Sequence, residues 1–264
     1  MIPFLDLLLD PLFRIPLFVG LIAAAILPLL GCYLRLRNEW LAALGLAHVA
    51  AACHLLGMAM HLPLLLSGAG GALVAVGVKQ LLKREGNGGY ALMMLGGWAA
   101  LYLVAANTTL GEAVSHALSD GQLYFANAEQ LLALGIGGGI TLALMPWWNQ
   151  RLLRACFFPT HEAANQLPAW RWHLSFDLAV ALLLALATGA IGLMGAFALV
   201  FLPPWLAFRL APNWRSGLLI AMLTGVSGYA LAFVLALKFD QPFGPVLVAV
   251  LLTVCSTGFL RRRH

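Results

Sequence analysis

The sequence predicts an all-α fold, a polytopic transmembrane bundle of about eight to nine helices in a single domain over residues 1–264. Hydrophobic residues make up 62% of the chain and charged residues only 9%, whereas about a quarter of the residues in soluble globular proteins are charged. Apolar blocks close to the ~20 residues that cross a bilayer follow one another with short polar interruptions. The basic residues stand at the ends of these blocks and not in a patch, so no nucleic-acid partner is expected.

The first half of the chain contains five apolar blocks whose flanking charges set their direction. The first block ends in Arg35 and Arg37, and the third returns the chain to Lys79, Lys83 and Arg84. Because lysine and arginine next to membrane helices favour the cytoplasmic side, the chain is expected to begin outside and to form a hairpin from its second and third blocks. The predicted spans are residues 13–34, 40–60, 62–82, 90–106 and 131–148.

The second half contains a block that is harder to divide. Residues 174–208 carry cytoplasmic charges at both ends but fall short of the ~40 residues that two full helices need. They predict either two short crossings or one long helix with a re-entrant piece, broken near residues 189–195 and again at Pro203-Pro204. The remaining predicted spans are 217–237 and 243–260, and the arginines after the last one indicate a cytoplasmic C-terminus.

Residues 151–173 form a long polar interval in a chain that is otherwise almost continuously apolar. Between its ends we expect a short amphipathic helix of about two turns on the membrane surface, with Thr160 as its N-cap, Glu162 at the positive end of its dipole and Pro168 at its end. The residue types typical of a cytoplasmic membrane boundary in this interval are Arg151, Arg154, Trp170, Arg171 and Trp172.

Four segments, taken in order, carry a family pattern. The more specific two are residues 191–209 (IGLMGAFALVFLPPWLAFR) and residues 239–245 (FDQPFGP). The other two are residues 31–37 (GCYLRLR) together with Leu46-Ala47-His48, and residues 162–169 (EAANQLPA). With these segments the sequence resembles the permease subunit of the bacterial zinc, manganese and iron ABC importers.

The resemblance implies a type II ABC-importer fold in the bacterial inner membrane, with a cytoplasmic coupling helix at about residues 154–173. The implied partners are an ATP-binding-cassette ATPase, an extracytoplasmic metal-binding protein, a second copy of the chain and membrane lipid. The chain is expected not to be an enzyme, because it contains no GxxxxGK[ST] motif to hold nucleotide phosphates. The residues expected to contact the ATPase are Thr160, His161, Glu162, Ala163, Ala164, Asn165, Gln166, Leu167 and Pro168.

Potential metal ligands repeat along the second block. His54, Met58 and His61 stand at i, i+4 and i+7 and are expected to share one helix face, and imidazole and thioether groups suit borderline and soft divalent ions. His48, at the family's Leu-Ser-His, lies about 120° around the helix and would act from another face or as a separate gate. These residues predict a transported ion, zinc first and manganese or iron as alternatives, with no permanently bound cofactor. Packing in an apolar core is the competing interpretation.

Other polar residues are weaker candidates. Glu112 and His116, one helical turn apart in the outer interval 107–130, could collect metal, although a solvated surface explains them equally well. Asp177 is either a gate or a partly hydrated residue at the inner boundary of its helix. Cys53 lies next to His54 but on another face.

The sequence departs from the family pattern at three places. Ala43-Leu44 stands where the family has Gly-Asp, Ala52-Cys53 where it has Pro-Gly, and Gly86-Asn87 where it has an acidic pair. Two alternatives stay open: a permease for a metal chelate of the siderophore or cobalamin type, and a membrane scaffold that transports nothing.

Overall fold

The computed structural model describes residues 11–82, 86–108 and 123–260, and all regular structure in these residues is helical. Among them, seven helices are long and apolar enough to cross a membrane, and shorter apolar helices cover residues 66–81 and 243–256. The predicted all-α transmembrane bundle is confirmed. The helices are α2 (Pro11–Leu36), α3 (Trp40–Ala59), α4 (Leu64–Leu81), α5 (Asn87–Ala106), the 3-10 helix η2 (Leu123–Phe125), α7 (Ala128–Phe157), α8 (His161–Ala164), α9 (Trp170–Ile191), α10 (Leu193–Leu210), α11 (Trp214–Phe239) and α12 (Phe243–Leu260).

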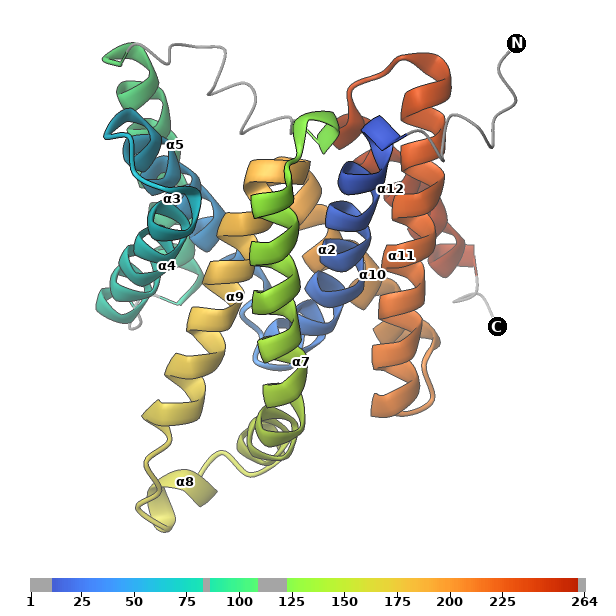
Figure 1. Cartoon of the computed structure of the whole chain (residues 1–264). Helices are drawn as coiled ribbons and strands as arrows, with labels where there is room; N and C mark the ends of the chain where they lie inside the picture. The colour runs from blue at the N-terminus through green and yellow to red at the C-terminus, as the bar shows by residue number, and fades with distance from the viewer. Residues whose placement is uncertain (1–10, 83–85, 109–122, 261–264) are drawn as a thin grey trace.

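The helices are grouped around the central α2, α9 and α10 (Figure 1). Helices α3, α4 and α5 lie together on one side, α11 and α12 lie on the other, and α7 packs against α2 and α9. Helix α7 continues beyond the rest of the bundle to α8, which marks one end of the molecule. The helix ends that point this way carry Arg35, Lys79 and Arg154, so the positive-inside rule assigns this end to the cytoplasm.

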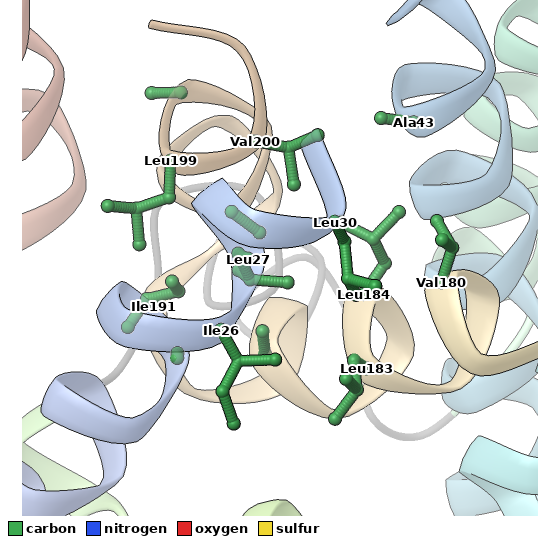
Figure 2. Close-up of a cluster of buried hydrophobic side chains, with 14 of the residues drawn as sticks. Ile26, Leu27, Leu30, Ala43, Val180, Leu183, Leu184, Ile191, Leu199 and Val200 are labelled. Carbon is green, nitrogen blue, oxygen red and sulfur yellow. The ribbon is translucent and has the colours of Figure 1, made fainter. Parts of the chain in front are cut away.

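The core lies where α2 crosses α9 and α10, as Figure 2 shows. In a membrane, lipid is as apolar as the side chains, so tight packing holds such helices together. The labelled side chains are all buried and come from α2 (Ile26, Leu27, Leu30), α3 (Ala43), α9 (Val180, Leu183, Leu184, Ile191) and α10 (Leu199, Val200).

The block that the sequence left undivided forms two helices, α9 and α10, separated by Gly192. Gly192 has φ 79° and ψ 161°, a conformation that is essentially restricted to glycine. The break predicted near residues 189–195 is therefore confirmed. The break predicted at Pro203-Pro204 is wrong, because both prolines lie inside α10.

The prolines of α10 are tolerated because a neighbouring helix covers the carbonyl that one of them leaves free. Pro204 has no N–H to donate to the carbonyl of Val200. That carbonyl lies directly against Gly31 of α2, where an added Cβ would collide with it. Neighbouring helices commonly compensate for proline in membrane helices, and here glycine makes the close approach possible.

Candidate functional site

His54 is the predicted ligand that lies in the interior. It is carried by α3 with 5% of its surface exposed, and its Nδ1 is 2.9 Å from the Oγ of Ser67 on α4. The other ring nitrogen, Nε2, faces α9, because a Cβ added to Gly189 would lie 3.8 Å from it. A metal-binding imidazole usually has one nitrogen held by a hydrogen bond and the other directed at the ion. The geometry of His54 fits that arrangement.

Sequence reasoning missed two neighbours of His54, namely Ser67 and Gln130. Gln130 lies in the first turn of α7, and a Cβ added to Gly189 would also be 3.9 Å from its side-chain nitrogen. Ser67 reaches His54 because Gly57 lets α3 and α4 approach, and a Cβ at that glycine would overlap the Ser67 side chain. The small-residue run SGAGG that begins at Ser67 indicates such an approach but does not identify the partner.

His48 is also buried, with 6% of its surface exposed, but it faces different neighbours. Its Nδ1 is 2.8 Å from the carbonyl oxygen of Leu44. Its backbone and Cβ lie against α5, where a Cβ on Gly97 would collide with them. As the helical spacing predicts, His48 and His54 do not form one ligand set.

The expectation that His54, Met58 and His61 share one helix face is wrong for His61. Helix α3 ends at Ala59, and His61 adopts the left-handed conformation with φ 58°. The N–H of the next residue donates to a carbonyl five residues earlier at 2.9 Å, the 6→1 bond with which many helices close. His61 is exposed and Met58 is 36% exposed, so both lie at the surface near the outer end of α3.

The structure describes no closed metal cage. Within the described residues, no three or more His, Cys, Asp or Glu side chains gather closely enough to hold a metal ion. Cys53 lies against Gly71 of α4. Glu112 and His116 lie outside the described residues. A metal ion bound at His54 would therefore take most of its other ligands from groups other than His, Cys, Asp and Glu side chains of the described residues.

A second polar cluster lies near the cytoplasmic ends of the same helices. One carboxylate oxygen of Asp177 on α9 accepts a hydrogen bond from Lys79 Nζ at 2.7 Å and another from Arg37 at 2.9 Å. Glu39, just before α3, is 2.9 Å from each of the same two cations. The side chains of Asp177 and Lys79 are 2% and 5% exposed. We call Arg37, Glu39, Lys79 and Asp177 the ionic cluster.

The ionic cluster rules out one of the two interpretations of Asp177 and gives Arg37 and Lys79 a further role. Asp177 is 1% exposed, so it is not a partly hydrated boundary residue. Arg37 and Lys79, which the sequence indicates only as cytoplasmic markers, are partners of buried carboxylates. Burial by itself lowers the pKa of the Arg37 guanidinium, but the negative charges of Asp177 and Glu39 raise it by more. The pKa therefore lies above the ordinary value. The sequence could not reveal the pairing, because Arg37 and Asp177 are 140 residues apart.

The cytoplasmic segment after α7 is shorter than predicted. Helix α8 covers only the four residues His161–Ala164, and Thr160 makes no side-chain capping bond. Thr160 stands at the N-cap position, as predicted, but the expected side-chain capping bond, the length of two turns and the end at Pro168 are wrong. The chain turns earlier, at Gln166 with φ 48°, where the N–H of Leu167 donates a bond of 3.0 Å to the carbonyl of Glu162 and closes the turn.

Glu162 connects α8 to the first turn of α9. Its carboxylate accepts a hydrogen bond from the Trp172 indole at 2.8 Å and lies 3.2 Å from Nε2 of His173. The contact was not expected, because the sequence indicates only a favourable position near a helix N-terminus. Beside it, Phe157 and Trp170 are 68% and 64% exposed, so the segment presents large apolar side chains at the cytoplasmic end.

Helix α7 is anchored to the bundle before this segment begins. The Oδ1 of Asn149 accepts hydrogen bonds from the Tyr33 hydroxyl at 2.9 Å and from the Trp214 indole at 2.7 Å. The neighbouring Trp148 donates to the Ser175 hydroxyl at 3.0 Å. These bonds tie α7 to α2, α11 and α9.

Known proteins share this sequence pattern over most of the chain. A family model described as the ABC 3 transport family matches residues 10–261. The chain is 23% identical over 240 residues to the manganese transport system membrane protein MntB of Synechocystis sp., covering 90% of this chain and 77% of that protein. It is 21% identical over 244 residues to the chelated iron transport system membrane protein YfeD of Yersinia pestis, covering 91% and 82%.

The fold is similar to a solved structure of PsaBC from Streptococcus pneumoniae in complex with Fab. The TM-score is 0.87 with 15% sequence identity, over 97% of this chain and 94% of that chain. The likeness supports the bundle architecture. As a permease subunit, the chain is a multi-pass protein of the bacterial inner membrane. Because the family model matches residues 10–261, the chain belongs to the ABC 3 transport family, as its sequence resemblance predicted.

Proposed function

We propose that this chain is the permease of an importer for a divalent transition metal, zinc, and that a separate ATP-binding-cassette ATPase energises it. The observation that carries the choice of zinc is His54, whose Nδ1 is held by Ser67 while its Nε2 faces α9. Imidazole suits zinc, whereas manganese prefers oxygen ligands. A site with few protein ligands also releases its ion readily, as conduction requires.

The other predicted ligands have separate places in this proposal. Met58 and His61, exposed near the outer end of α3, form the approach to His54, where an extracytoplasmic metal-binding protein delivers the ion. His48, on the α5 side of α3, acts as a separate gate.

The ATPase is proposed to dock on residues 160–168 and the adjoining ends of α7 and α9. Exposed apolar side chains at the cytoplasmic end, such as Phe157, Phe158 and Trp170, are typical of a surface that another protein covers. Deletion of residues 160–166 should abolish co-purification of the ATPase and metal uptake. Retention of both by the deletion variant would contradict the docking site.

A second copy of the chain is proposed to pack on α7. Nothing lies within 4 Å of a Cβ at Gly135 or Gly139, and Ile136 and Ile140 beside them are 63% and 56% exposed. Glycines four residues apart allow close helix pairing in membranes. Gly135→Leu with Gly139→Leu should convert purified dimers to monomers in light scattering, and an unchanged mass would reject this face.

The test of the zinc proposal is uptake of radioactive zinc in cells that lack other zinc importers. His54→Leu should abolish uptake at an unchanged protein level, because an apolar side chain suits that depth but offers no donor atom. Val74→Leu, an exposed position on α4, is the control and should transport normally. Zinc uptake by the His54 variant, or a parent protein that carries only manganese or only chelated iron, would reject the proposal.

A further inference from the structure

The ionic cluster and the surroundings of His54 lie at opposite ends of one helix interface. Helices α3, α4 and α9 pack against one another pairwise. Ser67 and Lys79 are twelve residues apart on α4, as are Asp177 and Gly189 on α9, which places the two ends about 18 Å apart at ~1.5 Å per helical residue. We call this interface the α3–α4–α9 seam.

Between these ends the buried faces of α4 and α9 are almost entirely apolar. Thr188 is the one buried polar residue in the intervening part of α9, and its hydroxyl is satisfied by the carbonyl of Leu184 at 2.7 Å. The buried residues of the intervening stretches are Ala72, Ala75 and Val76 on α4 and Val180, Ala181, Leu183, Leu184, Ala185, Leu186, Ala187 and Thr188 on α9. The ionic cluster therefore stands alone at the cytoplasmic end of this apolar stretch.

Two hollows meet at the ionic cluster. A cavity of about 380 Å³ is lined by Lys79 and Asp177, and a second cavity of about 380 Å³ lies towards α7. Arg37, Glu39 and His173 line both cavities. Arg37, Glu39 and His173 thus lie between the two spaces, while Lys79 and Asp177 line only the first.

We propose that the ionic cluster is a latch that closes the cytoplasmic end of the α3–α4–α9 seam, and that Glu162 and His173 connect α8 to this latch. Three of the four pairs join different segments, since Arg37 and Glu39 lie in the connection between α2 and α3, Lys79 lies on α4 and Asp177 on α9. Separation of α4 from α9 requires that the Lys79–Asp177 pair break. A salt bridge can re-form after such a movement, whereas a wedged apolar core would have to repack.

The link to α8 follows from a short chain of contacts. Glu162 lines the same cavity as Lys79 and Asp177, and its carboxylate is 3.2 Å from His173. His173 in turn lies one helical turn before Asp177 on α9 and lines both hollows. A displacement of α8 therefore reaches the latch through the contact between the Glu162 carboxylate and the His173 imidazole and one turn of helix.

The test measures access to the latch from the cytoplasm. Leu174 lines the first cavity, so Leu174→Cys is introduced with Cys156→Ser, which removes the exposed native cysteine. The full-length protein in inside-out membrane vesicles is labelled with a membrane-impermeant maleimide. Lys79→Met with Asp177→Leu removes one charge of each sign and leaves Arg37 paired with Glu39, and it should raise the labelling rate about tenfold or more.

The matched control removes the same two charge types elsewhere. Lys238→Met with Asp240→Asn, at the outer end of α11, should leave the labelling rate unchanged. If the Lys79→Met and Asp177→Leu double variant does not reach the membrane, Lys79→Gln with Asp177→Asn, which removes the same two charges with side chains of similar size, is measured in its place. An unchanged rate in a folded variant would show that the cluster is a fixed structural clamp and overturn the proposal. The assay uses neither zinc nor ATPase, so its outcome is independent of the proposed substrate.

Discussion

The two ends of the α3–α4–α9 seam solve the problem of buried polar groups in opposite ways. At the outer end, His54 and Ser67 share one hydrogen bond of 2.9 Å, and no described residue donates to or accepts from the second ring nitrogen of His54. At the inner end, Lys79 and Asp177 are paired with each other and each with a further partner. The second ring nitrogen of His54 can therefore bind a ligand, while the inner end is complete without any.

The comparison also predicts an energetic difference. Removing one member of a buried ion-pair network leaves an uncompensated charge, which costs about 3–5 kcal/mol. A neutral hydrogen bond contributes only about 0.5–1.5 kcal/mol. Stability should therefore depend on the inner end of the seam, and ligand affinity on the outer end.

The largest effect is expected from Asp177→Asn, which leaves Arg37 and Lys79 with one carboxylate between them. The free energy of unfolding of the purified protein in detergent should fall by about 3–5 kcal/mol. Lys79→Met with Asp177→Leu should lie within about 1 kcal/mol of the parent, because replacing a whole buried pair by apolar residues is often neutral. Equal destabilisation of the single and double variants would show that packing, and not charge balance, dominates here.

A smaller loss is expected when the outer end is forced apart. Gly57→Ala places a Cβ against the Ser67 side chain, and such overpacking typically costs about 1–3 kcal/mol. Gly70→Ala on α4 is the control, since nothing lies within 4 Å of its Cβ. Thermal unfolding that ranks the two alanine variants equally would contradict the close contact of α3 and α4.

Ser67→Ala should act on zinc affinity more than on folding. Loss of the hydroxyl frees the His54 ring to reorient, and removal of such a supporting hydrogen bond typically weakens metal affinity by about 10–100-fold. Zinc uptake kinetics should show a raised KM with a similar maximal rate. Ser175→Ala, which removes the partner of Trp148, should leave the KM for zinc unchanged; a raised KM in that control would mean that the effect is not local.

The smallest change in stability is expected from Glu162→Gln. A partly exposed pair such as Glu162 and His173 contributes about 0–1 kcal/mol, and glutamine keeps an acceptor for the Trp172 indole. When it is combined with Leu174→Cys and Cys156→Ser, the variant should nevertheless react with the maleimide faster than the parent, because the contact between residue 162 and His173 is then weakened. Identical labelling rates would place Glu162 outside the latch.

The helices of the fold could be predicted from the sequence because span length and flanking charge are local properties. The apolar blocks and the region of Gly192 were located correctly. Pro203-Pro204 was misjudged because the compensation for proline comes from Gly31, which is distant in sequence.

The candidate site could be predicted only in part. Helical spacing correctly placed His48 and His54 on different faces. It wrongly predicted that the helix continues to His61, because α3 ends before this residue, whose backbone is left-handed. The length of α8 and the role of Glu162 depend on the contact with α9. The ionic cluster joins residues from three segments, the connection between α2 and α3, α4 and α9, and no local pattern encodes such a pairing.

If α9 rotates about Gly192, the glycine between α9 and α10, residues farther from that glycine move farther. A helix of 22 residues is about 33 Å long, so a rotation of about 5° about Gly192 would carry Trp170 through about 3 Å. Asp177 would travel about 2 Å, enough to part ion pairs of 2.7 and 2.9 Å. Gly189, three residues from the pivot, would move less than about 0.5 Å. A single rotation of α9 would thus break the ion pairs at the inner end of the seam while the surroundings of His54 stay in place.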